Sequence, residues 1–297
     1  MAQPGSPRGR CAIKPRGAPD PERWLSIRSV SIIVATRGAK IGRCNICGDY
    51  GKLTDDHTPP KGCIRVGQVA IQHIVDRLGT EKPNYKGRHS QNGVKFKTLC
   101  SQCNNGRLGA NYDVAFNSFV NAVGRFLCSS LVLPRTMTVR ESPQKIMRSV
   151  LGHMAAQGVD RYEKGAITEP LRNYFLDGTL PLPIRFNIYY WVFPHKGQVL
   201  VRDCAFVDLS VKEPVAIWLA KFFPIAFMVT IDEPAGYSFN LPNLAVWREC
   251  KIDDTVEIAV PLHNSIHQYW PEAPTETSVV VYGQEAIHAR QLPRIQS

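Results

Sequence analysis

The sequence predicts an α+β protein with a zinc-stapled N-terminal domain and an α+β C-terminal domain of mainly antiparallel strands. Two Cys-x-x-Cys pairs, Cys44/Cys47 and Cys100/Cys103, bracket an Asp-Asp-His sequence at residues 55–57, and two such pairs are typical of zinc-binding domains. Apolar residues at helical spacing follow the second pair. After about residue 180, short β-branched and aromatic runs alternate with turn residues, which is typical of antiparallel sheets.

Length and charge limit the domain organisation. The 297 residues, 44% of them hydrophobic, can build one large or two modest domains with a full core. A net charge of +11, with a pI near 9.3, favours a polyanionic partner. Residues 1–22 are rich in Pro, Gly and Arg and predict a disordered basic tail. We assign residues 23–135 to the first domain and residues 140–297 to the second.

The cysteines and the apolar runs indicate a reducing compartment and no membrane attachment. Four of the nine cysteines are assigned to the two pairs. The other five, an odd and scattered set, give no disulfide pattern, which fits a cytoplasmic protein. We expect no secretory leader. We also expect no membrane span, because no apolar run reaches about 18 residues.

The doubled Cys-x-x-Cys motif predicts a structural zinc site. Each motif presents two sulfurs on one side of a tight turn, and four thiolates complete the tetrahedral coordination of zinc. Such a site leaves no position for substrate, so the ion would stabilise the fold and take no part in chemistry. The 52 residues between Cys47 and Cys100 must then form a subdomain.

Polar residues beside the cysteines form a candidate second site. Asp55, Asp56 and His57 lie between the two pairs, and Asn104 and Asn105 directly follow the last cysteine. An imidazole is suited to activating water near neutral pH. Carboxylate and carboxamide oxygens suit a hard cation such as Mg²⁺. If Asp56 and His57 lie on a strand, their side chains point to opposite sides.

This segment resembles the HNH endonucleases of the His-Me finger, or ββα-metal, group. The resemblance rests on the first cysteine pair together with Leu53–Lys61 (Leu-Thr-Asp-Asp-His-Thr-Pro-Pro-Lys) and Leu99–Asn105 (Leu-Cys-Ser-Gln-Cys-Asn-Asn). It covers roughly residues 43–125, less than half of the chain. It implies a zinc-stapled ββα-metal nuclease domain, and a metal-dependent hydrolase of phosphodiester bonds with DNA favoured over RNA.

The resemblance also implies roles for individual residues. His57 would be the general base that activates water. Asp56 and Asn104 would bind a catalytic Mg²⁺ or Mn²⁺ ion that stabilises the leaving 3′ oxygen. Two assignments stay open, because Asp55 competes with Asp56 and Asn105 competes with Asn104.

One position departs from the family pattern. Where the family has a middle asparagine shortly before the third cysteine, this chain has Lys95, and Asn92 lies nearby but out of register. The middle residue normally fixes the loop that carries the base. Its identity here is open.

Basic residues near the motif are candidates for contacts with nucleic acid. Arg107 would lie one turn into the helix that follows Asn105, where a helix start also offers free N–H groups to a phosphate. Lys95 begins a predicted strand over residues 94–99, and Arg88 belongs to a polar, basic loop over residues 83–93. Each could equally be a solvated surface charge.

Hydrophobic spacing predicts the remaining elements. Apolar residues over 67–78 predict an amphipathic helix, and a second helix is expected from Asn105 to about residue 131. Ser142 and Pro143 are suited to begin another helix. A further helix is expected over residues 168–176. Strands are predicted in the rest of the chain at residues 184–193, 198–207, 215–222, 226–231, 244–250, 256–261 and 278–282. We expect the first two of these strands to form a hairpin around the turn at residues 195–197.

The C-terminal domain carries no catalytic motif. We expect it to select the target, to dock a regulatory protein or to form a homodimer. Two other functions would use the same features. One is a non-catalytic zinc module that binds nucleic acid, which Lys95 in place of the middle asparagine favours. The other is a protein-interaction scaffold whose nuclease site has decayed.

Overall fold

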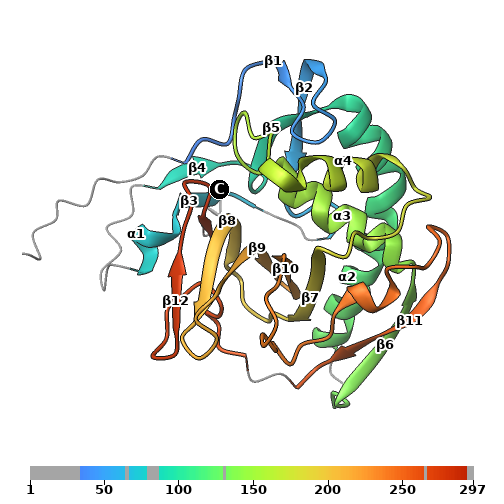
Figure 1. Ribbon diagram of the computed structural model, residues 1–297, viewed down its shortest axis with the longest axis vertical. Coiled ribbons are helices and arrows are strands. Elements are labelled where there is room, and N and C mark those ends of the chain that lie inside the picture. The colour runs from blue at the N-terminus through green and yellow to red at the C-terminus, as the bar shows by residue number, and fades with distance from the viewer. Residues whose placement is uncertain (1–33, 64–66, 79–86, 130–131, 264–265, 293–297) are drawn as a thin grey trace, which may run out of the picture. The chain divides into compact units, whose positions relative to one another are not determined.

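A computed structural model describes residues 34–63, 67–78, 87–129, 132–263 and 266–292, which all belong to one compact unit. The tail predicted for residues 1–22 lies outside these ranges. The described chain is mixed α+β with mostly antiparallel sheets, which confirms the predicted class at that level (Figure 1).

Three short antiparallel strands form the smaller sheet. They follow the order β1-β2-β5, so the strand that precedes the first cysteine pair lies at one edge. Both pairings are antiparallel. The strands are β1 (Ile41–Arg43), β2 (Tyr50–His57) and β5 (Lys95–Cys100).

A β-bulge decides which side of β2 faces the interior. The register between β2 and β5 shifts between Thr54 and Asp55, as at a bulge. Leu53 and Asp56, three positions apart, therefore both point inward and are 6% and 1% exposed. The bulge buries the second of the two adjacent carboxylates and leaves the first on the outside.

β5 leads into a long continuous helical run. A π-helical segment, η2 (Gln102–Tyr112), continues directly into α2 (Asp113–Leu127). The helix predicted after Asn105 is confirmed, although it begins earlier, at Gln102. Phe116 and Phe119 are buried, as their spacing predicts.

Eight antiparallel strands form the larger sheet. Their order is β4-β3-β13-β8-β9-β10-β7, and β12 pairs with β8 outside this path. The sheet thus combines two strands from the segment between the cysteine pairs with six from the second half of the chain. The strands are β3 (Val69–His73), β4 (Arg88–Ser90), β7 (Phe186–Val192), β8 (Gln198–Asp208), β9 (Pro214–Phe222), β10 (Ile225–Ile231), β12 (Ser278–Val281) and β13 (Ile287–Gln291).

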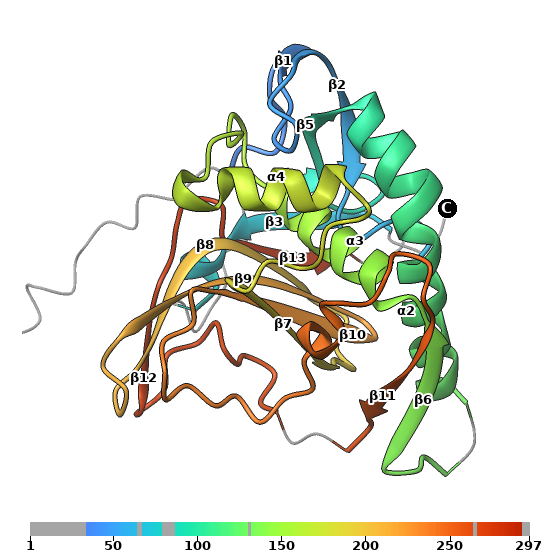
Figure 2. The ribbon, with the colours of Figure 1, turned by 45° about the vertical axis from the view of Figure 1, so that its right-hand side comes forward.

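Helices cover one face of this sheet (Figure 2). α3 begins as predicted, with Pro143 in its first turn and the Ser142 side chain accepting a hydrogen bond from the backbone N–H of Lys145. A separate antiparallel pair joins β6 to β11. None of the described helices is long and apolar enough to cross a membrane. The remaining elements are α3 (Pro143–Ala156), η3 (Gly165–Ile167), α4 (Thr168–Leu176), β6 (Thr136–Glu141) and β11 (Val256–Pro261).

Two predicted elements are wrong in type. The segment over residues 67–78 is strand β3 followed by the short helix α1 (Ile74–Leu78), because β3 is buried between β13 and β4. A short apolar run buried on both faces fits a strand as well as a helix. The strand predicted over residues 244–250 is instead the 3₁₀ turn η4 (Leu244–Trp247).

The predicted hairpin between β7 and β8 is also wrong, although both strands form. β7 pairs with β10, and β8 pairs with β9. β9 and β10 form the actual hairpin and lie between the other two strands. The turn residues at 195–197 fix a reversal of the chain but not the partner of each strand.

Alternating side chains give the larger sheet two apolar faces. On one face, Tyr190 and Trp218 pack with α2, α3 and Phe96 of the smaller sheet in the main core. On the other face, Trp191 belongs to a second cluster. The main core includes side chains from both sides of the predicted domain boundary at residues 135–140, and that boundary stays a prediction.

Candidate metal centre and catalytic site

Four cysteine sulfurs meet where the turn between β1 and β2 approaches the start of η2. The Sγ atoms of Cys44, Cys47, Cys100 and Cys103 all lie within 4.8 Å of one another. Those of Cys47 and Cys100 are 3.8 Å apart, a separation that fits two bonds of about 2.3 Å to one tetrahedral zinc ion. The predicted ligands are therefore brought together, and the cluster could hold a metal ion such as zinc.

Asn45, inside the first cysteine pair, fixes this cluster to the chain after α3. Its side chain is fully buried. Its Nδ2 donates to the carbonyl of Gly158 at 2.8 Å, and its Oδ1 accepts from the backbone N–H of Arg161 at 3.0 Å. Its own backbone N–H donates to the carbonyl of Thr98 in β5 at 2.9 Å. Sequence analysis missed this residue, whose only signal was its place between two cysteines.

The outer side of the antiparallel β2–β5 strand pair carries the candidate base. Asp55 lies opposite Lys97, and His57 lies opposite Lys95. The Lys97 Nζ atom is 3.7 Å from Asp55 Oδ1. Asp55 is exposed and His57 is half-buried. One carboxylate, one imidazole and two ammonium groups therefore share this side of the strand pair.

The surroundings of His57 keep its imidazole neutral. Burial, followed by the charges of Lys61 and Lys95, lowers the pKa of His57 to about 4. Its Nε2 atom is buried and has no hydrogen-bond partner within the described ranges. A neutral imidazole can accept a proton, which is what a general base must do.

Asp56, on the inner side of β2, belongs to a buried triad of charges. His153 of α3 places Nδ1 3.0 Å from Asp56 Oδ2 and Nε2 2.9 Å from Asp113 Oδ1. Thr58 Oγ1 donates to Asp56 at 3.1 Å, and Ser149 Oγ donates to Asp113 at 2.7 Å. Burial lowers the pKa of His153, but the two carboxylates outweigh burial and raise it to about 10. The imidazolium thus donates to both carboxyl groups. Burial raises the pKa of Asp56, whereas for Asp113 burial is outweighed by the charge of His153, which holds the pKa below its usual range.

Sequence analysis did not find this triad. His153 is a single histidine among the buried residues Val150, Leu151 and Met154, and no motif distinguishes it. The only signal was a titratable group in an otherwise apolar helix. The resemblance assigns Asp56 to a catalytic cation, and the structure places its carboxyl group against His153, on the opposite side of β2 from the His57 side chain.

Asn104 links the start of η2 to the bulge of β2. Its Nδ2 donates to Thr54 Oγ1 at 2.9 Å and to the carbonyl of Asp55 at 3.0 Å. Asn105 instead donates to Ser101 Oγ, one turn earlier, at 3.1 Å. Of the two amides, Asn104 is therefore the one that lies against the strand of the candidate base.

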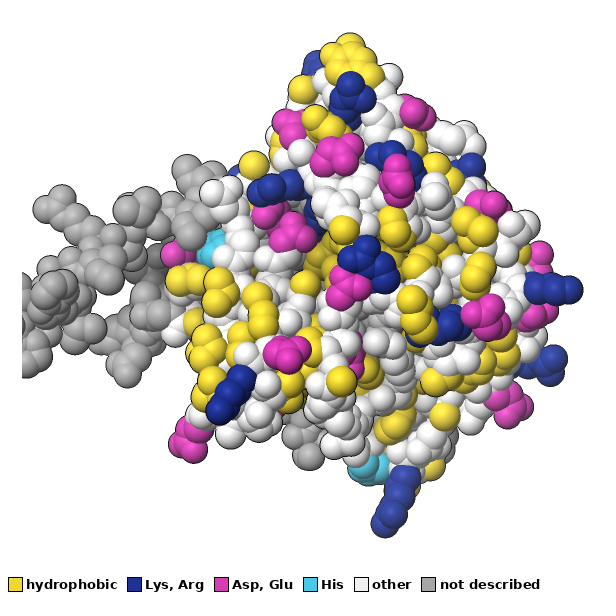
Figure 3. All heavy atoms as spheres, viewed as in Figure 1, with side chains coloured by type: hydrophobic (Ala, Val, Ile, Leu, Met, Phe, Trp, Pro, Cys, Tyr) yellow, Lys and Arg dark blue, Asp and Glu magenta, His cyan; other side chains and the backbone are white. Residues whose placement is uncertain are grey.

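The three basic residues predicted to contact nucleic acid lie in different places. Lys95 is the cross-strand neighbour of His57. Arg107 donates to the carbonyl of Leu176, at the end of α4, at 2.6 Å, and Arg88 donates to Thr36 Oγ1. On the face in Figure 3, Lys and Arg side chains are interspersed with Asp and Glu. Lys95 is thus the one that the structure brings to the candidate site.

Comparison of the chain with protein-family models, with curated proteins and with solved structures finds no match.

Replacing one cluster cysteine should remove the metal and destabilise the smaller sheet. We expect Cys100→Ser to lower the zinc content of the purified protein and its melting temperature, because zinc binding contributes directly to folding. Cys128→Ser, at an exposed cysteine outside the cluster, is the matched control and should change neither. Elemental analysis and thermal unfolding measure both quantities. Full zinc content in Cys100→Ser would contradict the assignment.

The His153 triad should make stability depend on pH. The folded-state pKa of His153, about 10, exceeds its ordinary value of 6.5. Its contribution is therefore complete below about pH 6.5 and is lost as the pH rises towards about 10. The free energy of unfolding of wild type relative to His153→Gln should shrink over this range by up to about 1.4 kcal/mol per pH unit. Denaturant unfolding at several pH values measures this difference, and a difference independent of pH would contradict the triad.

Proposed function

We propose that this protein is a metal-dependent endonuclease of the HNH type that hydrolyses phosphodiester bonds, with DNA as the favoured substrate. The observation that carries the proposal is the outer side of the β2–β5 strand pair. There a neutral, half-buried His57 lies on the same side as Asp55 and beside Lys95. The four-cysteine cluster supports the proposal because it could fix both ends of this unit.

Each group on the outer side of the β2–β5 strand pair has a role in this proposal. His57 accepts a proton from the attacking water, which requires the neutral imidazole that its surroundings favour. Lys95 and Lys97 attract the phosphate backbone. Asn104 holds the bulge of β2 in place through its bonds to Thr54 and Asp55.

Oxygen donors at the β2–β5 strand pair fit a divalent cation. The carboxylate of Asp55 and the carboxamide oxygen of Asn104 are donors of the kind that Mg²⁺ or Mn²⁺ takes. Asp55 fits this task better than Asp56, because Asp56 is buried and bonded to His153 and Thr58. When bound, such an ion would neutralise charge on the leaving 3′ oxygen.

A second candidate function is a non-catalytic zinc module that binds nucleic acid. The buried pairing of Asp56 with His153 favours it, since that pairing removes the carboxylate that the HNH pattern assigns to the cation. Lys95 in place of the middle asparagine favours it as well. The two functions differ in whether nucleic acid is cut and in whether His57 is required.

Cleavage should depend on His57. With Mg²⁺ or Mn²⁺, the purified protein should cut plasmid DNA, and His57→Ala should reduce the rate by roughly 10²- to 10⁴-fold, the contribution of a general base. His89→Ala, at an exposed histidine on β4, is the matched control and should cut at the rate of wild type. Gel assays with and without chelator measure the rates, with a structured RNA as a second substrate.

The outcomes separate the candidate functions. Cutting that survives His57→Ala would reject His57 as the base. Salt-dependent binding of DNA without cutting, by both wild type and His57→Ala, would instead support the recognition module.

The two adjacent carboxylates should fail in different ways. Asp55→Ala should abolish cutting and leave stability nearly unchanged, because its side chain is exposed. Asp56→Ala should lower the free energy of unfolding by roughly 3–5 kcal/mol, because it leaves His153 with one of its two buried partners. Chemical denaturation and metal-titrated cleavage assays distinguish the two. A stable but inactive Asp56→Ala variant would return the cation to Asp56.

A further inference from the structure

A hollow of about 590 Å³ lies on the face of the larger sheet that α2 and α3 do not cover. Its size falls within the range of about 300–1,000 Å³ that is common for ligand pockets. Its walls come from the end of β8, from the loop after β10 and from the segment before β12. These parts of the chain are distinct from the candidate nuclease site.

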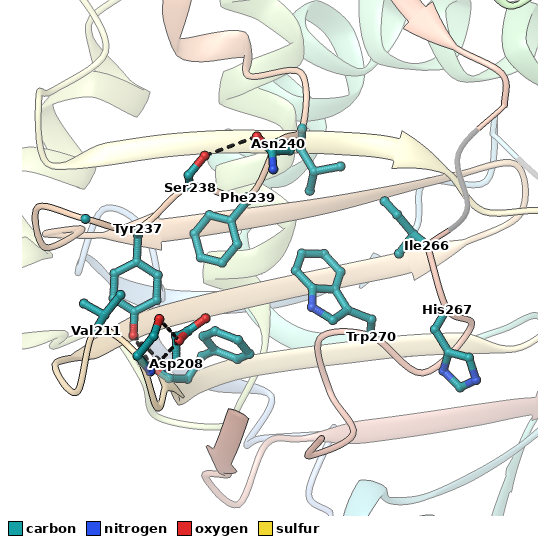
Figure 4. Close-up of a pocket in the computed structure, with 13 residues that line it drawn as sticks. Asp208, Val211, Tyr237, Ser238, Phe239, Asn240, Ile266, His267 and Trp270 are labelled. Atoms are coloured by element: carbon teal, nitrogen blue, oxygen red, sulfur yellow. Dashed lines mark hydrogen bonds between the residues drawn. The ribbon is translucent and has the colours of Figure 1, made fainter. Parts of the chain in front are cut away.

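Four aromatic rings line this hollow (Figure 4). The Phe239 ring contacts the other three. It contacts Tyr237 at 5.5 Å, in a stacked arrangement, and Phe206 and Trp270 at 6.0 and 6.1 Å between ring centroids. Figure 4 shows Tyr237 and Trp270 on opposite sides of Phe239. The four rings therefore form one contiguous aromatic wall of the hollow.

The charge of the lining is negative. Asp208 is the only Asp, Glu, Lys or Arg among the described residues that line the hollow. Its Oδ1 accepts hydrogen bonds from the backbone and the hydroxyl of Ser210, which hold the pKa of Asp208 below its usual range. Figure 4 shows this carboxylate on the Tyr237 side. The pocket thus combines π faces with one carboxylate that is ionised at neutral pH.

Trp270 is held in place from behind by a buried ion pair. The Nζ atom of Lys221, which has no exposed side-chain surface, donates to the carbonyl of Trp270 at 2.9 Å and to both oxygens of Glu272 at 2.7 Å. The indole also packs edge-on against Trp191, with centroids 5.4 Å apart. The Trp270 wall is therefore preorganised in the absence of ligand.

We propose that this aromatic pocket binds a methylated ammonium group, with the rings of Tyr237, Phe239 and Trp270 facing its methyl groups and Asp208 balancing its charge. A cation over aromatic faces is attracted by the ring quadrupoles, and quaternary ammonium ions are bound in aromatic cages for this reason. The proposal is independent of the proposed nuclease function, because it uses none of the residues of the β2–β5 strand pair.

Charge distinguishes this ligand from a nucleotide. A nucleobase would also stack on these rings, but its phosphate would meet Asp208 with no lysine or arginine among the described lining residues. A purely apolar ligand would gain nothing from the negative charge of Asp208. A cation with an apolar surface satisfies the rings and the carboxylate together.

The test titrates the full-length protein with four small probes, and calorimetry and tryptophan fluorescence measure their binding. We expect tetramethylammonium and choline to bind saturably, and the neutral carbon isostere of choline, dimethylbutanol, to bind on the order of tenfold more weakly. Equal binding of the isostere would overturn the proposal, as would no saturable binding of either cation. Tighter binding of adenosine monophosphate than of tetramethylammonium would replace it with a nucleotide site.

Variants test the location and the source of the ligand. Asp208→Asn and Trp270→Leu should each weaken tetramethylammonium binding on the order of tenfold, whereas Glu257→Gln, at an exposed carboxylate on β11, should not. Unchanged binding in Asp208→Asn, which keeps the shape of the side chain, would overturn the proposal. A trimethyl-lysine peptide that binds more tightly than choline, beside its unmethylated form, would identify a protein tail as the source. The reverse order would identify a free small molecule.

Discussion

The buried triad of Asp56, His153 and Asp113 is the interaction on which the arrangement of the candidate site depends. Each of its members comes from a different element: β2, α3 and α2. Two carboxyl groups surround one imidazolium, Thr58 and Ser149 also donate to them, and burial raises the pKa of Asp56. The triad therefore fixes the end of β2 against both helices, and it specifies which side of that strand faces out.

The same constraint separates the chemistry of two histidines. His153, enclosed by carboxylates, has its pKa raised to about 10, while His57, half-buried beside two lysines, has its pKa lowered to about 4. Titratable groups whose surroundings move their pKa values apart are typical of sites with assigned acid and base tasks. His153 is a structural cation and a positioning residue, whereas His57 is neutral and suited to accept a proton. The four-cysteine cluster and Asn45 support this unit from its other end.

Sequence predicted the parts of the structure that depend on local patterns. The cysteine spacing identified all four members of the cluster, and Ser142 with Pro143 marked the start of α3. Local patterns did not predict which distant strands pair. β7 and β8 form where predicted, but β9 and β10 lie between them in the sheet. The inward turn of Asp56 depends on a bulge and on a histidine 97 positions away, and neither leaves a local pattern. The aromatic pocket was missed for the same reason, since its rings come from three separate segments.

A direct measurement of the two histidines tests this account at its centre. In a histidine-labelled sample of the full chain, nuclear magnetic resonance can follow each imidazole as the pH changes, with His57→Ala and His153→Gln assigning the signals. The account predicts that His57 stays neutral until the pH approaches about 4, and that His153 stays protonated until it approaches about 10. Two histidines that both titrate near the ordinary value of 6.5 would contradict both the buried triad and the neutral base.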